Sequence, residues 1–293
     1  MNNSTAYQNI WYQGHDGLKL YARDYAYQGI QSEPKGTILC LHGLSRNSAD
    51  FDYLCQHLAK DYRVIAADQR GRGLSEYDSH FENYNLPIYL QDMLTLLSTL
   101  NLSQVILIGT SMGGLMSMLL ALMAPEKVLA LVLNDVGPEL NPAGLERIKG
   151  YVGKQKPVTN WDQAIAQVRE INAEVFPDLD DEGWRNIARA IFHENDKGQP
   201  VLAFDPAIAQ SITESETSSP PENLWTQFKA ITNTPLLLLR GESSDILSVE
   251  CVGKMKTINP AMDYCEVANR GHAPLLNETD SVAAIDTFLE KIS

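Results

Sequence analysis

A serine between two glycines has the setting that nucleophilic catalysis requires. Ser111 lies at the centre of Gly109-Thr110-Ser111-Met112-Gly113. The apolar run 105–108 before it predicts a short buried strand, and residues 114–124 after it predict a helix. Ser111 is therefore predicted to lie on a strand-turn-helix corner, where the two flanking glycines leave room for a strained backbone. Such a corner lifts the hydroxyl out of the fold, and the positive end of the helix favours an oxyanion beside it.

A serine hydroxyl also needs a base to take its proton and a third group to orient that base. In proteins with a nucleophile elbow, as this strand-turn-helix corner is called, the acid and then the histidine follow the serine along the chain. Two histidines, His193 and His272, lie beyond Ser111. His272 lies in a loop between a predicted last strand, 264–267, and a predicted last helix, 280–291. His193 lies in a polar stretch typical of a solvated turn, for which we predict a surface role. We therefore predict that His272 is the general base.

Three carboxylates are candidates for the third group. Asp245 follows a predicted buried strand, 235–241, and so lies at the same carboxyl edge of the sheet as the His272 loop. We predict that Asp245 is the acid. Glu242 in the same loop is an alternative, and so is Asp135, which ends another apolar strand at that edge. An Asx-type turn is a sufficient structural explanation for Asp135.

The oxyanion that forms during acyl transfer needs two backbone donors. The N–H of Met112, next to the serine, is the first. A predicted strand over residues 37–41 runs into His42-Gly43-Leu44, and the turn after it is expected to bring the N–H of Leu44 close to the serine. We interpret His42 as a brace for this loop through hydrogen bonds, with Gly43 allowing close backbone approach.

These motifs together resemble those of the α/β-hydrolase superfamily, and the resemblance runs through nearly the whole chain. Residues 41–43 resemble its oxyanion loop, residues 68–75 (DQRGRGLS) its D-x-R-G-x-G-x-S turn, and residues 271–274 its histidine loop. Residues 42–48 and 134–138 are similar to those of capped bacterial hydrolases related to carboxylesterases and 3-oxoadipate enol-lactonases. The resemblance implies a mostly parallel eight-stranded α/β sheet with helices on both faces and an inserted helical cap. It also implies a catalytic triad of Ser111, Asp245 and His272.

The order of the predicted elements agrees with that architecture. Strand-like and helix-like segments alternate from residue 37 to 135 and again from 235 to the end, which is typical of a parallel sheet wrapped by helices. Between them the pattern becomes helical and proline-separated. We predict a hydrolase core over residues 1–137 and 221–293 and a helical cap over 138–220. The cap carries aromatic side chains that are candidates to line a pocket: Tyr151, Trp161, Phe176, Trp184, Phe192 and Phe204.

Composition limits the partners. The net charge of −14 and the pI of about 4.8 argue against nucleic acid and anionic membrane, which would repel this chain. Its four cysteines have no metal or redox spacing, its N-terminus has no signal-like segment, and no apolar run could span a bilayer, so we expect a cytoplasmic protein. The acidic residues 178–182 are expected to cap a helix rather than bind metal. Neither a phosphate loop nor a dinucleotide fingerprint is present, and we expect no metal and no cofactor.

The sequence therefore predicts a serine hydrolase that cleaves a small carboxylic ester or lactone through an acyl-enzyme. Carbon–carbon bond hydrolysis of a ring-cleavage product, acyl transfer and perhydrolysis would use the same residues. A ligand receptor without catalysis is a further alternative on this fold. The sequence leaves the oligomeric state and the identity of the substrate open.

Overall fold

The structure is a computed structural model that describes residues 6–215 and 224–292. Its centre is one sheet of eight strands, in the order β1-β2-β4-β3-β5-β6-β9-β10. The strands β1 and β2 form a hairpin, β2 pairs antiparallel with β4, and all later neighbours are parallel. This arrangement confirms the predicted mostly parallel eight-stranded sheet. The strand bounds are β1 Gln8–Gln13, β2 Lys19–Tyr25, β3 Thr37–Leu41, β4 Arg63–Asp68, β5 Val105–Thr110, β6 Val128–Asn134, β9 Leu236–Gly241 and β10 Asp263–Val267.

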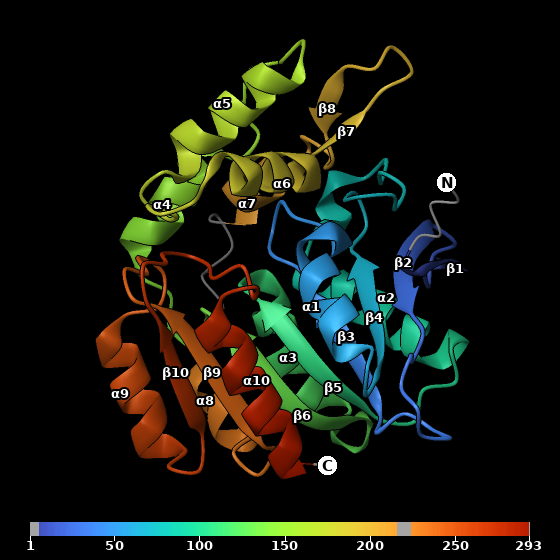
Figure 1. Cartoon of the computed structure of the whole chain (residues 1–293), viewed down its shortest axis with the longest axis vertical. Helices are drawn as coiled ribbons and strands as arrows, with labels where there is room; N and C mark the ends of the chain where they lie inside the picture. Colours follow the sequence, from blue (N-terminus) through green and yellow to red (C-terminus); the bar gives the residue numbers. More distant parts are fainter. Residues whose placement is uncertain (1–5, 216–223, 293) are drawn as a thin grey trace.

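Helices cover both faces of this sheet (Figure 1). The bounds are α1 Asp52–Leu58, α2 Leu86–Thr99, α3 Met112–Met123, α8 Leu224–Ala230, α9 Val249–Ile258 and α10 Thr279–Ile292. Side chains of α1 and α10 pack on one face, and those of α2, α3, α8 and α9 on the other. The central strands are apolar at consecutive positions because both of their faces are buried: in β3, Leu39 faces one helical layer and Cys40 the other.

A second group of elements lies over the carboxyl ends of the central strands (Figure 1). It consists of α4 Pro142–Tyr151, α5 Trp161–Asn172, α6 Asp181–Ile191, β7 Phe192–Glu194, β8 Pro200–Leu202 and α7 Ile208–Ser215. We call residues 138–215 the cap segment. It has a small hydrophobic core of its own, which includes Val168, Trp184 and Ile187. The acidic stretch caps α6, where the Asp180 carboxylate accepts the N–H of Gly183 at 2.8 Å.

The hairpin β7–β8 was not predicted from the sequence. Its strands have three residues each, too few for an alternating pattern to be recognised, and it carries His193 on the exposed surface. The predicted second boundary of the cap, between residues 220 and 221, lies outside the described residues. Over the described ranges, no helix has both the length and the apolar character needed to cross a bilayer.

Candidate active site

Ser111 occupies a strained corner between β5 and α3. Its backbone has φ 54° and ψ −116°, a conformation that side-chain-bearing residues rarely adopt and that costs on the order of 1–3 kcal/mol. A methyl group on Gly109 would overlap the backbone of Gly113, and one on Gly113 would overlap the carbonyl oxygen of Leu41. The two glycines are therefore required by close backbone packing, and the corner presents the Ser111 hydroxyl above the sheet edge.

His272 lies against this hydroxyl. It comes from the loop after β10, and its Nε2 is 2.8 Å from Ser111 Oγ. Its Nδ1 is 2.8 Å from the Asp135 carboxylate, and its side chain is only 7% exposed. A carboxylate accepts and cannot donate, so Nδ1 carries the proton and Nε2 is left to accept the proton of Ser111. The structure thus joins serine, histidine and aspartate in one hydrogen-bonded chain.

The carboxylate that binds His272 in this series of hydrogen bonds is that of Asp135 and not that of Asp245. Asp135 directly follows β6, with φ 58°, and its side chain is fully buried. Its Oδ1 accepts the N–H of Gly241 at 2.8 Å, and its Oδ2 accepts the hydroxyl of Ser244 at 2.7 Å as well as the N–H of His272 Nδ1. Three donors, from the end of β9 and from the loops after β9 and β10, therefore hold this carboxylate in place. The interpretation of Asp135 as only a turn residue does not account for these contacts.

The carboxylate of Asp245 points to the cap segment instead. It accepts hydrogen bonds from Arg147 of α4, at 2.5 Å from Nε and 2.9 Å from Nη2. Burial favours a higher pKa for Asp245, but the hydrogen bond and charge of Arg147 outweigh it and keep that pKa below its ordinary value. The other alternative, Glu242, accepts the N–H of Asn269. The expected pairing of Asp245 with His272 is therefore wrong in this structure.

Strand order explains the difference. Asp245 does follow a strand at the expected edge, but β9 is separated from the serine strand β5 by β6. β6, which Asp135 directly follows, is the direct neighbour of β5. The chain order of strands does not reveal which pair is adjacent in the sheet, so both aspartates satisfy the same sequence pattern.

Hydrogen bonds from buried side chains hold the loop after β3 in place. His42 is fully buried, with Nδ1 at 2.7 Å from the Gly43 carbonyl oxygen and Nε2 accepting the N–H of Gln69 at 3.0 Å. Burial lowers the pKa of His42 to about 3, so the ring is neutral and its Nδ1–H donates to Gly43. Arg72, which the sequence analysis did not single out, donates from Nε to the carbonyl of Leu44 at 2.9 Å. These bonds fix the peptides around Gly43 and Leu44.

The N–H groups of Leu44 and Met112, both near Ser111, have no protein acceptor within the described residues. Met112 begins α3, so its N–H belongs to the unpaired first turn of that helix. Leu44 lines the same cavity as Ser111. Both groups are thus available as donors to an oxyanion.

The cavity between the core and the cap segment has a volume of about 790 Å³, within the range of small-molecule sites. Ser111 and His272 line it together with residues of α4, α5 and α6. The cap aromatics divide into two groups. Tyr151, Phe176, Phe192 and Phe204 line the cavity, whereas Trp161 and Trp184 do not, and Trp184 packs in the core of the cap segment.

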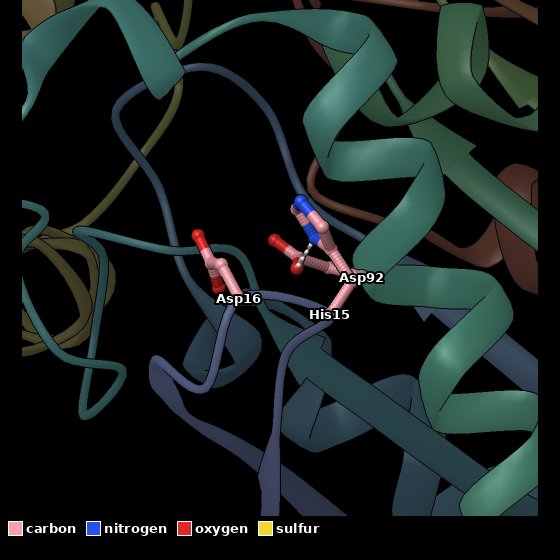
Figure 2. Close-up of side chains that lie close together, drawn as sticks. All are labelled: His15, Asp16 and Asp92. Carbon is pink, nitrogen blue, oxygen red and sulfur yellow. Dashed lines mark ion pairs between the residues drawn. The ribbon is translucent and has the colours of Figure 1, made fainter.

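A separate group of titratable side chains consists of His15, Asp16 and Asp92 (Figure 2). His15 Nδ1 lies 3.7 Å from Asp92. The guanidinium of Arg70 already binds these carboxylates: it donates to both oxygens of Asp92 at 2.8 Å and to Asp16 at 2.8 Å. The hydrogen bond from Arg70 lowers the pKa of Asp16 to about 2. This group is an ion-pair network that joins the β1–β2 turn to α2 and the loop after β4.

Comparison with known proteins places this geometry in context. Residues 36–279 match the family model described as the alpha/beta hydrolase fold. A 3-hydroxybutyrate-oligomer hydrolase of Cupriavidus necator is 35% identical over 275 residues, which cover 92% of this chain and 93% of that protein. A 2-(acetamidomethylene)succinate hydrolase of Mesorhizobium japonicum is 28% identical, over 86% of this chain and 87% of that protein.

A solved structure of an alpha/beta hydrolase from Novosphingobium aromaticivorans is similar over the whole length. It superposes with a TM-score of 0.91 at 39% identity, and the alignment covers 99% of this chain and 100% of that one. The family match spans most of the sequence, and the described fold carries a serine elbow and a histidine loop at the expected strand ends. The chain belongs to the α/β-hydrolase fold family and is a hydrolase of that family.

Proposed function

We propose that the protein cleaves a carboxylic ester through an acyl-enzyme formed on Ser111. The series of hydrogen bonds from Ser111 through His272 to Asp135, at the wall of the cavity beneath the cap segment, is the observation that carries this proposal. His272 Nε2 takes the proton as Ser111 Oγ attacks the carbonyl carbon, and then gives that proton to the leaving alcohol. A water molecule activated by His272 releases the acid and restores the serine.

Asp135 and the two unpaired N–H groups have distinct roles in this mechanism. Asp135 keeps the proton of His272 on Nδ1 and stabilises the imidazolium that forms when His272 takes the serine proton. The N–H groups of Leu44 and Met112 hold the oxyanion of the tetrahedral intermediate. Gly43 and His42 support the first donor, and Gly109 and Gly113 support the second.

The cavity and the relatives support the proposed substrate class. A site of this volume accommodates a small ester, and the similarity to a hydrolase of 3-hydroxybutyrate oligomers over nearly the whole of both chains favours short esters of hydroxy acids. Lactones would use the same three residues, as would carbon–carbon bond hydrolysis, acyl transfer or perhydrolysis. A panel of aryl esters with increasing acyl length, lactones, a ring-cleavage diketone and a linear 3-hydroxybutyrate dimer distinguishes these reactions.

The decisive variant is Ser111→Ala. We expect turnover to fall by on the order of a million-fold with the fold retained, because the hydroxyl does no core packing. A fluorophosphonate probe should label Ser111 in the wild type and nothing in the variant. Ser98→Ala, which changes an exposed serine of α2, is the matched control and should keep full activity and labelling. Near-native hydrolysis by Ser111→Ala would exclude the mechanism. Failure of the wild-type protein to turn over any ester would favour a receptor.

A further inference from the structure

The cavity beside Ser111 has an unusual charge for this protein. Three arginines line it, Arg23, Arg46 and Arg189, against two aspartates, Asp50 and Asp52, and the lining contains neither lysine nor glutamate. The chain as a whole carries a net charge of −14. Arg46 pairs with Asp50 and Arg23 lies 3.7 Å from Asp52, so the arginines and aspartates of the lining leave an excess of one positive charge. In a protein that repels anions in general, this excess favours an anionic group locally.

The side chain of Arg46 begins close to Ser111. A Cβ built on Gly43 would lie 3.6 Å from Arg46 Cγ and 3.7 Å from Ser111 Cβ, so the arginine and the nucleophile flank the same glycine. The N–H of Arg46 donates to the Gly43 carbonyl at 3.2 Å and closes the turn that carries Leu44. The side chain of Arg46 therefore starts at the loop after β3, which carries the N–H of Leu44, and lines the cavity from there. We call this loop the donor loop.

The guanidinium of Arg46 is held by Asp50 through two of its three nitrogens. Its Nε and Nη2 donate to the Asp50 carboxylate at 2.7 and 2.5 Å, and each of the two side chains is 22% exposed. The third nitrogen, Nη1, has no acceptor within the described residues, and the side chain lines the cavity. Because Asp50 holds the plane of the guanidinium, little side-chain freedom remains to be lost when Nη1 binds an anion.

The cap segment adds a second positive group to this side of the cavity. Asn47, the residue after Arg46, donates to the carbonyl of Ala190 in α6 at 2.6 Å and ties the donor loop to that helix. Arg189 precedes Ala190, is exposed and lines the cavity. No ion pair of Arg189 is found in the described part of the chain. It can attract an anion toward the site, whereas Arg46 lies beside the serine.

We infer that Arg46 binds a free carboxylate on the substrate, so that the enzyme prefers esters bearing a carboxylate a few bonds from the scissile carbonyl. This inference rests on the proposed esterase function and specifies its substrate class. An arginine–carboxylate hydrogen bond is charge-assisted and stronger than a neutral one. A linear oligomer of a 3-hydroxy acid has this chemistry, because two carbon atoms separate its terminal carboxylate from the last ester oxygen.

The test compares anionic and neutral esters of nearly equal shape. One pair is the linear 3-hydroxybutyrate dimer and its terminal carboxamide, which places the carboxylate on the alcohol side. The other is 4-nitrophenyl hemisuccinate and 4-nitrophenyl succinamate, which places it on the acyl side. The measured quantity is the ratio of kcat/KM for the anionic member to that for the neutral member, so that a general loss of reactivity cancels.

We expect the wild type to prefer the anion by about ten- to a hundred-fold in at least one pair, which is the range for a hydrogen bond to a charged group. Arg46→Gln should bring that ratio close to one, and Arg46→Lys should restore part of it, because lysine keeps the charge but loses the fork. Arg185→Gln removes an arginine of α6 that does not line the cavity, and should leave the ratio at its wild-type value.

Two results would overturn the inference while leaving the esterase function intact: equal hydrolysis of both members of each pair by the wild type, or an anion preference that persists in Arg46→Gln. Hydrolysis of none of the four esters by the wild type would remove the proposed function and the inference with it. The pair that shows the preference identifies the side of the ester on which the carboxylate lies.

Discussion

Asp135 illustrates how a single residue acquires its role from its partners. Its carboxylate accepts three hydrogen bonds, from Gly241 at the end of β9, from Ser244 in the loop after β9 and from His272, and its backbone N–H donates to the Leu239 carbonyl at 2.8 Å. Residues on β9 and its loop therefore determine where this aspartate, the residue after β6, points. Ser244 acts here as a positioning residue, one position before the aspartate that the sequence pattern favours.

The two aspartates can be separated by matched substitutions. We expect Asp135→Asn to lower kcat by roughly ten-thousand-fold at neutral pH, because an amide favours the wrong tautomer of His272. Asp245→Asn should cost far less, since it weakens a partly exposed contact with Arg147. Steady-state hydrolysis of one aryl ester by both variants measures the difference. The opposite ranking would return the acid to Asp245.

His42 provides a pH test at the same scale. Its pKa of about 3 in the folded protein lies below the ordinary value near 6.5, so the unfolded state binds the extra proton first as the pH falls. The stabilisation from neutral His42 is complete above pH 6.5 and declines between about pH 6.5 and pH 3, by up to roughly 1.4 kcal/mol per pH unit.

The stability of His42→Asn should therefore depend less on pH than that of the wild type. Urea unfolding at several pH values between 7 and 4 gives the free energy of unfolding of both proteins, and the gap between them should narrow toward low pH. Parallel curves would show that His42 does not remain neutral in the folded state. The comparison is between two proteins, so titration of the carboxylates common to both cancels.

At the scale of elements, the junction of β5 and α3 depends on close backbone contact. The first turn of α3 packs against the end of β3, where Gly113 meets the carbonyl of Leu41, and Gly114 meets the side chain of Val136. Strand, elbow and helix are held at a spacing that leaves no room for a side chain at Gly113. That spacing also sets how far the N–H of Met112 is from the donor loop after β3.

Gly113→Ala should therefore disturb the site as well as the fold. The added methyl group would overlap backbone atoms, which cannot move aside as the end of a flexible side chain can, so we expect a loss of about 1–3 kcal/mol and strongly reduced fluorophosphonate labelling. Gly253→Ala is the matched control. Gly253 lies on the exposed side of α9 with nothing near its Cβ position, and alanine there should raise stability by up to about 1 kcal/mol. Thermal unfolding of both variants measures the contrast, which equal effects would contradict.

For the whole molecule, the cap segment is attached to the core close to the site. Arg147 binds Asp245, Asn47 binds the carbonyl of Ala190, and the N–H of Gly271 donates to the carbonyl of Val175 at 2.9 Å. The last contact joins the cap segment to the residue before His272. The cap segment thus forms a wall of the cavity and supports the histidine loop, while Ser111, His272 and Asp135 themselves all lie outside the cap segment.

We propose on this basis that the cap segment sets specificity. Tyr151→Ala enlarges the cavity from the α4 side, and we expect it to shift the ranking of aryl esters toward longer acyl chains by roughly ten- to two-hundred-fold. Labelling by a small fluorophosphonate should persist, because Tyr151 contacts neither Ser111 nor His272 through a hydrogen bond. A folded Tyr151→Ala protein that is not labelled at all would show that the cap segment contributes to the chemistry itself.

The sequence alone determined the elements whose signals are local. Apolar runs bounded by glycine and proline predicted β3, β5, β6 and β9, and helical periodicity between prolines predicted α5 and α6. The elbow around Ser111 was predictable because the turn leaves no room for a side chain at Gly109 or Gly113, and this requirement shows within five residues of the sequence. The contact of His272 with Ser111 followed from the shared edge of a parallel sheet.

Only the tertiary structure decided which acid meets His272, because that choice depends on which strand neighbours β5 and on a cap arginine that draws Asp245 away. The same is true of Arg46 and Arg72, whose roles arise from partners brought together by folding. Strand order and side-chain pairing are relations between segments that are distant in the sequence. A local sequence pattern therefore does not predict them. The free energy that selects among such pairings comes from burial and hydrogen bonding across the whole fold.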